Sequence, residues 1–588
     1  MASCGNVEGL DARNPARGPG QLVGNGAPVS DGNFAGGNDT IPGPRGVVRA
    51  PEEGFTIDCG PGCREYCDAA EFENPVNQGI CPSLWGVGLA SQPIVPDEAC
   101  RRLYADMLGR YPTPRELDTT CAQETWGDVV NTLLDTDEFV FVNRRRWADI
   151  LLYNNRAVNF ERAWDMDELV AKAYEGRVGW DEFAAVTSAH PVMLRRRDTG
   201  GDRAAFVFET FIGRPPYESE RADLARLYRL WTNGYWTHPH VGVVPDAFID
   251  FRCVDGAGNP DPETIGECTS ILFGQHSLTL TPDVQRQEHD DEEQEGTMWS
   301  GFLKPEEWKK LQLPGRLIAQ EPAFWEHAAE TVLDQYFGYD LAAASPEVVH
   351  EMVKYLLQYN GDIRALHFAV ATSAPYLQSA HGETDTSFPW TYGPLKQIAV
   401  EGWIDSIAAT TGADLSSCDH RLPHPEDYAG EDALEEAVGN GWAGALVKFS
   451  NWELDDDRQI VTDYRNLART LGGCPSNEAS GRFTTVSVLN TAVQEAFVGE
   501  VCGIGDASGA NVDYLLPDAV GSQTFVSAEV ATDVLAHQSR VWFGRWPTTE
   551  ETAEAVAGAE ACGSSCEADS YSRSLCFALL SSAEMLFY

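Results

Sequence analysis

The sequence predicts a mostly α-helical protein built from stacked, repeat-like helical modules. Three observations lead to this prediction: a recurring helix–Gly–Arg–Pro pattern, apolar residues at helical spacing before each Gly, and very few candidate strands. Because helical repeats bury their apolar faces against their neighbours, several copies favour a stacked helical body. The copies are LYADMLGRYPTPRE (Leu103–Glu116), FVFETFIGRPPYESE (Phe206–Glu220), SRVWFGRWPTTEE (Ser539–Glu551) and, more loosely, TVLDQYFGYD (Thr331–Asp340).

Each copy contains signals that begin and end helices. The glycine after the apolar stripe should adopt the left-handed conformation that ends a helix. Thr113 with Glu116, and Thr548 with Glu551, have the spacing of a capping box that begins the next helix. The glycines in question are Gly109, Gly213, Gly338 and Gly544. Similar closing segments follow at Thr136–Phe139, Ser373–Tyr376 and Ser582–Met585, with a related one at Thr187–His190.

The pattern divides the chain into six expected parts. The first two are a Gly- and Pro-rich arm or tether and a Cys-rich irregular segment stapled by disulfides. The rest are helical blocks, the second of which contains an insertion with a small β-like piece and an acidic run. Another candidate strand is Thr484–Leu489. The expected ranges are 1–49, 50–95, 96–197, 198–382 with its insertion at 237–302, 383–526 and 527–588.

The charge excludes some partners. The chain carries 90 acidic and 42 basic residues, a formal net charge of −48 at pH 7. Such a surface repels phosphate backbones and anionic lipids, so we expect no nucleic-acid partner. The sequence also has no run of eighteen apolar residues, so a membrane would be reached only through a lipid anchor.

The fifteen cysteines indicate an oxidising, extracytoplasmic compartment. Cys4 follows small residues and precedes Gly5, as lipidated cysteines of bacterial lipoproteins do, and is the lipidation candidate. No apolar signal region precedes Cys4, so either the start is truncated or replaced, or Cys4 is an ordinary residue. The other fourteen are disulfide candidates: Cys59, Cys63, Cys67, Cys81, Cys100, Cys121, Cys253, Cys268, Cys418, Cys474, Cys502, Cys562, Cys566 and Cys576.

Some of these cysteines suggest particular pairings. The first four, from Cys59 to Cys81, could hold zinc, but two disulfides fit an oxidising compartment better. Cys253 and Cys268 bracket a turn-rich loop and are the best local pair. Of the last three cysteines, one must reach elsewhere, to Cys502 or Cys474.

A family resemblance rests on three phrases. LYADMLGRYPTPREL, EPAFWEHAAETVLDQYFGYD and GDIRALHFAVATSAPYLQSA resemble secreted, mostly helical domains of unknown function in planctomycetes and myxobacteria, which are associated with cytochrome c modules. The likeness is clearest over Ala323–Ala380 and fragmentary over Asp97–Phe139. It implies an exported, helical, surface-associated protein and assigns no catalytic residue. This sequence departs from those relatives because it contains no Cys-x-x-Cys-His haem motif.

Metal binding has two weak candidates. His420 and His424, with Glu426, form a histidine-rich segment, but the neighbouring prolines disfavour the helix that would bring them together. An acidic run has the carboxylate density that Ca²⁺ prefers, yet lacks the ligand order of a defined calcium loop. Its candidate ligands are Asp290, Asp291 and Glu293. Otherwise we expect no cofactor.

The sequence contains no recognisable catalytic motif, including G-x-S-x-G and the Walker loop. We therefore expect a non-enzymatic, lipoprotein-like subunit of an assembly at the outer membrane or cell surface. Its partners would be other envelope proteins, copies of itself or a separate cytochrome. The alternative is a metal-dependent hydrolase or a redox accessory protein of the cell envelope.

Overall fold

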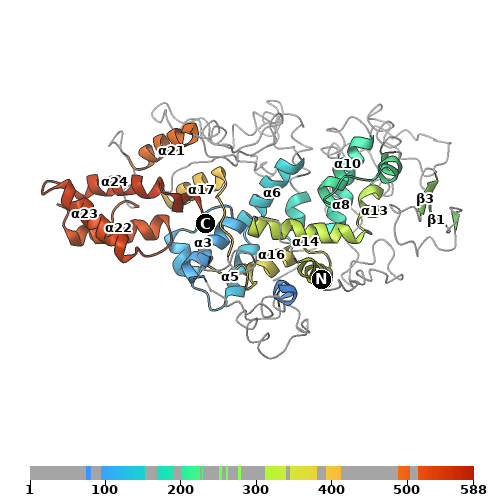
Figure 1. Ribbon diagram of the computed structural model, residues 1–588, viewed down its shortest axis with the longest axis horizontal. Coiled ribbons are helices and arrows are strands. Elements are labelled where there is room, and N and C mark those ends of the chain that lie inside the picture. The colour runs from blue at the N-terminus through green and yellow to red at the C-terminus, as the bar shows by residue number, and fades with distance from the viewer. Residues whose placement is uncertain are drawn as a thin grey trace, which may run out of the picture. The chain divides into compact units, whose positions relative to one another are not determined.

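The computed structural model of the chain confirms that the protein is mostly α-helical (Figure 1). In the part of the chain that it describes, no helix is long and apolar enough to cross a membrane. The described residues are 74–80, 94–151, 166, 169–190, 200–225, 228, 250–254, 260–261, 276–279, 312–338, 345–379, 393–411, 488–503, 514–522 and 524–588.

The chain forms two compact units, and each takes residues from several parts of the sequence. The first unit comprises Met1–Gly88, Asn143–Gln335 and Tyr339–Ser373. The second comprises Leu89–Val142, Tyr336–Gly338 and Ala374–Tyr588. Two of the boundaries between the units fall within helices, one in α6 (Asp137–Leu151) and one in α14 (Pro322–Phe337). The six-part division expected from the sequence stays a prediction.

The second unit has a helical core. Trp403 packs edge-on against Phe497, with 5.3 Å between ring centroids, and Tyr514 packs in the same way against Trp542. These rings belong to one cluster of buried apolar side chains. The helices are α3 (Pro96–Met107), α4 (Pro114–Thr119), α5 (Trp126–Leu134), α17 (Val400–Thr411), α21 (Val488–Val501), α22 (Ala528–Trp542), α23 (Thr549–Cys562), α24 (Ala568–Leu580) and α25 (Ala583–Leu586).

The first unit is built around aromatic side chains. Trp147 packs edge-on against Phe183 and stacks on Phe211, with centroid distances of 4.8 and 5.8 Å. His367 is completely buried beside Tyr174, and burial lowers the pKa of His367 to about 3, so its imidazole is neutral at pH 7. Helices that lie wholly in this unit include α8 (Trp180–Ala189), α10 (Gly200–Phe211), α13 (Leu313–Ile318), α15 (Pro346–Gln358) and α16 (Arg364–Ala371).

Three sets of consecutive helices follow one plan: α3–α4–α5, α14–α15–α16 and α22–α23–α24. The first helix of each set ends at a glycine with positive φ, namely Gly109 at 68°, Gly338 at 72° and Gly544 at 72°. The third helix of each set ends in a turn in which an amide donates to the carbonyl three residues earlier. The residues that donate are Thr136, Ser373 and Ser582. A buried side chain follows each turn: Phe139, Tyr376 and Met585. The predicted glycine conformations are confirmed, including Gly213 at 75° after α10.

Among the described residues, the regular structure outside the helices is short. Strands β1 (Asp250–Val254), β2 (Pro260–Asp261) and β3 (His276–Thr279) form an antiparallel sheet in the order β2-β1-β3. Most of the expected insertion lies outside the described residues, so its β-containing character and its bounds stay predictions. The prediction of a strand at Thr484–Leu489 is wrong at its C-terminal end, because Val488 and Leu489 belong to the first turn of α21 (Val488–Val501).

Candidate functional site

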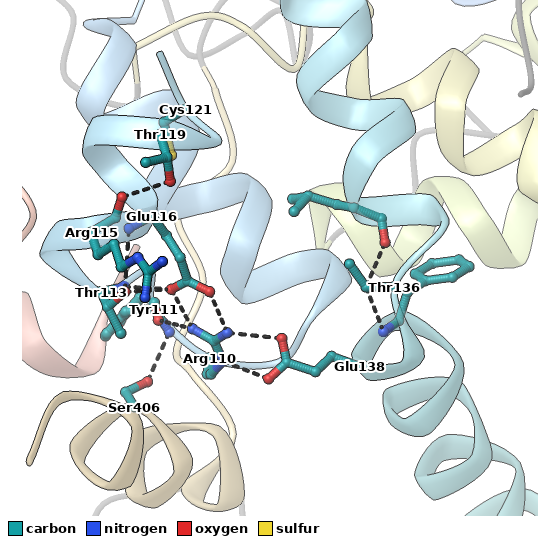
Figure 2. A network of polar contacts seen from close by, with 12 residues as sticks. Arg110, Tyr111, Thr113, Arg115, Glu116, Thr119, Cys121, Thr136, Glu138 and Ser406 are labelled. Carbon is teal, nitrogen blue, oxygen red and sulfur yellow. Dashed lines mark hydrogen bonds and ion pairs between the residues drawn. The ribbon is translucent and has the colours of Figure 1, made fainter. Parts of the chain in front are cut away.

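A dense polar network surrounds Arg110, which follows the glycine of the first repeat (Figure 2). Its Nη1 and Nη2 donate to Glu116 at 2.8 and 2.7 Å. Its Nε and Nη2 donate to Glu138 at 3.0 and 2.8 Å, and Nη1 also donates to the carbonyl of Tyr111. All five N–H groups of the guanidinium are therefore used, in two bidentate carboxylate pairs and one backbone bond.

Arg545, in the last repeat, makes the same contacts. Its Nη1 and Nη2 donate to Glu551 at 2.9 and 2.6 Å, and its Nε and Nη2 donate to Glu584 at 2.6 and 2.7 Å. Its Nη1 also donates to the carbonyl of Trp546. We call this arrangement the arginine clamp: an arginine after the helix-ending glycine, held by two carboxylates. It connects the end of the first helix to the start of the second and to the residues that follow the third.

Half of the clamp recurs at Arg214. Its Nη1 and Nη2 donate to Glu220, both at 2.9 Å, and Nη1 donates to the carbonyl of Pro215. The hydrogen bonds to Glu220 raise the pKa of Arg214, and the charge of Glu321 adds a smaller effect in the same direction. Glu321 lies in the turn after α13, where its amide donates to Ile318, and Phe324 is completely buried just beyond it. Glu321 thus lies at the turn position that Thr136 and Ser582 occupy in the complete clamps, two residues before the position that supplies the second carboxylate there.

The first glutamate of each clamp also caps a helix. Oε2 of Glu116, Glu220 and Glu551 accepts the amides of Thr113, Tyr217 and Thr548 at 2.7, 2.7 and 2.6 Å. The capping boxes predicted at Thr113 and Thr548 are confirmed, with both reciprocal bonds present. Each glutamate therefore closes a helix N-terminus and neutralises the arginine at the same time.

The clamp shifts the pKa values of Arg110, Arg545 and Glu551. Burial by itself would lower the pKa of Arg110, but its hydrogen bonds to Glu116 and Glu138 outweigh burial and raise that pKa above its usual value. The hydrogen bonds of Arg545, followed by those of Thr548, hold the pKa of Glu551 at about 2. Arg110, Arg545 and Glu551 are thus charged at pH 7, and none of these three is poised to exchange a proton near neutrality.

A second polar cluster surrounds Asp106 on α3. Its Oδ2 accepts from the hydroxyl of Tyr376 at 2.7 Å, and its Oδ1 accepts from the hydroxyl of Tyr588 at 2.8 Å and from Lys396. Burial, followed by the nearby charge of Asp106, raises the pKa of Tyr376 well above its usual value. The neighbouring Arg102 donates to two backbone carbonyls, those of Tyr376 and Gln378. These bonds attach α3 to distant segments of the second unit.

Helix α17 packs closely on the turn that carries the first clamp. Oγ of Ser406 accepts the amide of Tyr111 at 2.8 Å (Figure 2). One turn earlier, a Cβ on Gly402 would lie 1.9 Å from the carbonyl oxygen of Gly109, so only glycine fits there. The guanidinium of Arg101 covers the Tyr111 ring, 3.8 Å from its centroid. The turn is therefore held from two sides.

Among the described residues, six of the candidate cysteines form three disulfides: Cys100–Cys121, Cys502–Cys576 and Cys562–Cys566. The first lies within the first helical set, and the second connects α21 to α24. Of the two partners considered for the C-terminal cysteines, Cys502 is the one used. Disulfides of this kind are typical of an extracytoplasmic compartment.

The remaining site candidates are not tested by the structure. Cys253 belongs to strand β1, but its side chain is not described. Among the described residues, no group of three or more His, Cys, Asp or Glu side chains could hold a metal ion. Outside the described residues lie the metal candidates His420, His424, Glu426, Asp290, Asp291 and Glu293, and Cys4, Cys59, Cys63, Cys67, Cys81, Cys268, Cys418 and Cys474.

Sequence reasoning missed both polar clusters. A signal for the clamp was present, because the two copies with a complete clamp have Glu as the third residue of the closing segment, in Thr136-Asp-Glu and Ser582-Ala-Glu. No comparable signal marked the partners of Asp106, which lie 270 to 482 residues away in the sequence.

Comparison with known proteins identifies a family that matches part of the chain. No curated protein and no solved structure is significantly similar to the chain. The family match covers a segment that lies N-terminal to Ala323–Ala380, the range in which the family resemblance of the sequence was clearest. This segment includes the first two Gly-Arg turns. Residues 75–223 match PSCyt2, a family described as protein of unknown function (DUF1549), which confirms over that segment the resemblance to helical domains of unknown function.

Proposed function

We propose that this chain is an exported, non-enzymatic protein that acts as a structural or binding subunit of an assembly at the cell surface or outer membrane. One observation carries the proposal: the charged groups at the centre of these polar networks have structural partners. Arg110 and Arg545 each use every N–H group within a clamp, and Asp106 binds Lys396 and two tyrosine hydroxyls. Groups arranged in this way fix helices to one another.

The disulfides and the charge support the location of this role. Three disulfides among the described residues suit an oxidising compartment. A net charge of −48 keeps copies of such a protein apart unless a specific contact offsets the repulsion. We propose that the arm at residues 1–49 supplies this contact in an assembly, and that Cys4 carries a lipid.

The experiment compares the full chain with a variant that lacks residues 5–49. Size in solution is measured by light scattering, helix content by circular dichroism, and metal content by elemental analysis. The proposal expects a large complex for the full chain and a smaller, still helical species for the variant. A monomer in both cases would contradict the assembly role. A stoichiometric metal together with hydrolytic activity would favour the alternative, a metal-dependent enzyme.

A further inference from the structure

Helix α23 is held mainly at its ends. Only two of its side chains are buried, Ala555 and Ala559. At its N-terminus the clamp around Arg545 and the Thr548 cap fix the first turn. Midway, the Ala555 carbonyl accepts the hydroxyl of Tyr571 at 2.8 Å. Because little apolar surface is buried along the helix, its last two turns depend on what holds the C-terminus.

That C-terminus is held by the Cys562–Cys566 disulfide. Cys562 is the last residue of α23 and is exposed, as are the three residues between the two cysteines. A Cβ on Gly563 would meet nothing within 4 Å, so the loop has open space beside it. A reagent in solution can therefore approach the disulfide from the side of Cys562.

The two cysteines differ in how their backbones are held. Cys566 is 6% exposed, and its carbonyl accepts the amide of Val526 at 2.9 Å. Two residues on, Ala568 donates to the carbonyl of Thr524 at 2.8 Å. Cys566 therefore keeps its place when the disulfide opens, whereas Cys562 is released together with the end of α23.

The other two described disulfides are better protected. Cys502 and Cys576 are both completely buried, and so is Cys100. The loops that they close are also longer, with sequence separations of 74 and 21 against 4 for Cys562–Cys566. A longer closed loop restricts the unfolded chain more, so opening the short loop has the smallest effect on the rest of the fold.

We propose that Cys562–Cys566 is a thiol–disulfide exchange site, at which a dithiol reductant releases the C-terminal half of α23. A thiolate of the reductant attacks Sγ of Cys562, the S–S bond breaks, and Cys566 leaves as a thiolate that takes up a proton. The second thiol of the reductant then attacks the mixed disulfide and releases Cys562 as a thiol. The protein gains two electrons and two protons, and the reductant becomes a disulfide. Exchange with an oxidised dithiol reverses the reaction.

The test treats the oxidised full-length protein with increasing concentrations of dithiothreitol and, separately, with reduced thioredoxin. Free thiols are trapped by alkylation and located by mass spectrometry. We expect Cys562 and Cys566 to be labelled at least about tenfold faster than the Cys100–Cys121 and Cys502–Cys576 pairs. Under conditions that open only this disulfide, amide hydrogen exchange should accelerate in residues 555–562 and stay unchanged in α24.

The matched control is the double variant Cys562→Ser, Cys566→Ser. Without any reductant it should show the fast exchange of residues 555–562, and mild reduction should change it no further. The proposal is overturned if Cys562 and Cys566 are labelled together with, or after, the buried pairs. It is also overturned if α23 exchanges at the same rate in the oxidised protein, the reduced protein and the double variant.

Discussion

Arg110 and Arg545 make the same five hydrogen bonds, atom for atom, although they belong to the first and last helical sets of the chain. In both, Nη1 and Nη2 bind the glutamate six residues later, Nε and Nη2 bind a glutamate after the third helix, and Nη1 binds the next carbonyl. The two sets therefore share a tertiary arrangement as well as a sequence pattern of helix ends. In each set, the arginine connects the end of the first helix to the second helix and to the residues that follow the third.

Replacing Arg110 with Met should destabilise the protein by about 2–3 kcal/mol, because two carboxylates would lose their cation. Fully buried pairs lose roughly 3–5 kcal/mol on such a change, and the smaller value follows from solvent screening of Glu138, whose side chain is 42% exposed. Urea unfolding followed by circular dichroism measures the difference. Arg115→Met, an exposed change on the neighbouring helix α4, is the control and should stay within about 0.5 kcal/mol of wild type.

The clamp at Arg545 should make stability depend on acid. Its hydrogen bonds lower the pKa of Glu551 from a usual 4.5 to about 2 in the folded state. Because the pKa of Glu551 is lower in the folded than in the unfolded state, its ion pair stabilises the fold fully at pH values above the unfolded pKa. This stabilisation is lost as the pH falls from 4.5 to about 2. The difference in unfolding free energy between wild type and Glu551→Gln should therefore shrink over that window. The control is Glu550→Gln, a change at an exposed neighbouring residue. The difference in unfolding free energy between wild type and this variant should stay near zero at every pH.

The sequence predicted the parts of the repeat that are decided within a few residues. Helix stops at Gly109 and Gly544, the caps at Thr113 and Thr548, and the proline at the start of α4 all depend on neighbours in sequence. Backbone sterics and side-chain caps act at that range, so one sequence is enough to identify them.

The polar partners could not be predicted in the same way. Glu138 lies 28 residues from Arg110, and Glu584 lies 39 residues from Arg545. In an acidic chain with 90 carboxylates, nothing in a single sequence selects one partner over another. The Asp106 cluster is harder still, because its members meet only when several segments of the second unit are folded.

Ser406 offers a test of how α17 is attached. Its hydroxyl is the acceptor for the buried amide of Tyr111, so Ser406→Ala leaves that N–H without its acceptor. We expect a loss of about 1–3 kcal/mol, the usual effect of an unsatisfied buried polar group. Ser574→Ala on α24 removes an exposed hydroxyl that bonds only to its own helix, at Ser570, and should change stability by less than about 0.5 kcal/mol. Equal effects of the two changes would contradict the attachment.

Two glycines in helices give a sharper comparison, because the same substitution should act in opposite directions. A Cβ on Gly402 would lie 1.9 Å from the Gly109 carbonyl oxygen, and backbone cannot move away as a side chain can. Gly402→Ala should therefore separate α17 from the turn and cost about 1–3 kcal/mol or more.

Gly558, within α23, is exposed, and a Cβ there would meet nothing within 4 Å. Gly558→Ala should stabilise the protein by about 0.5–1 kcal/mol, because alanine loses less backbone entropy than glycine on forming a helix. Thermal unfolding of the two variants beside wild type measures both effects. A neutral Gly402→Ala would show that α17 does not rest on the clamp-bearing turn. A destabilising Gly558→Ala would show that the exposed face of α23 is covered in solution.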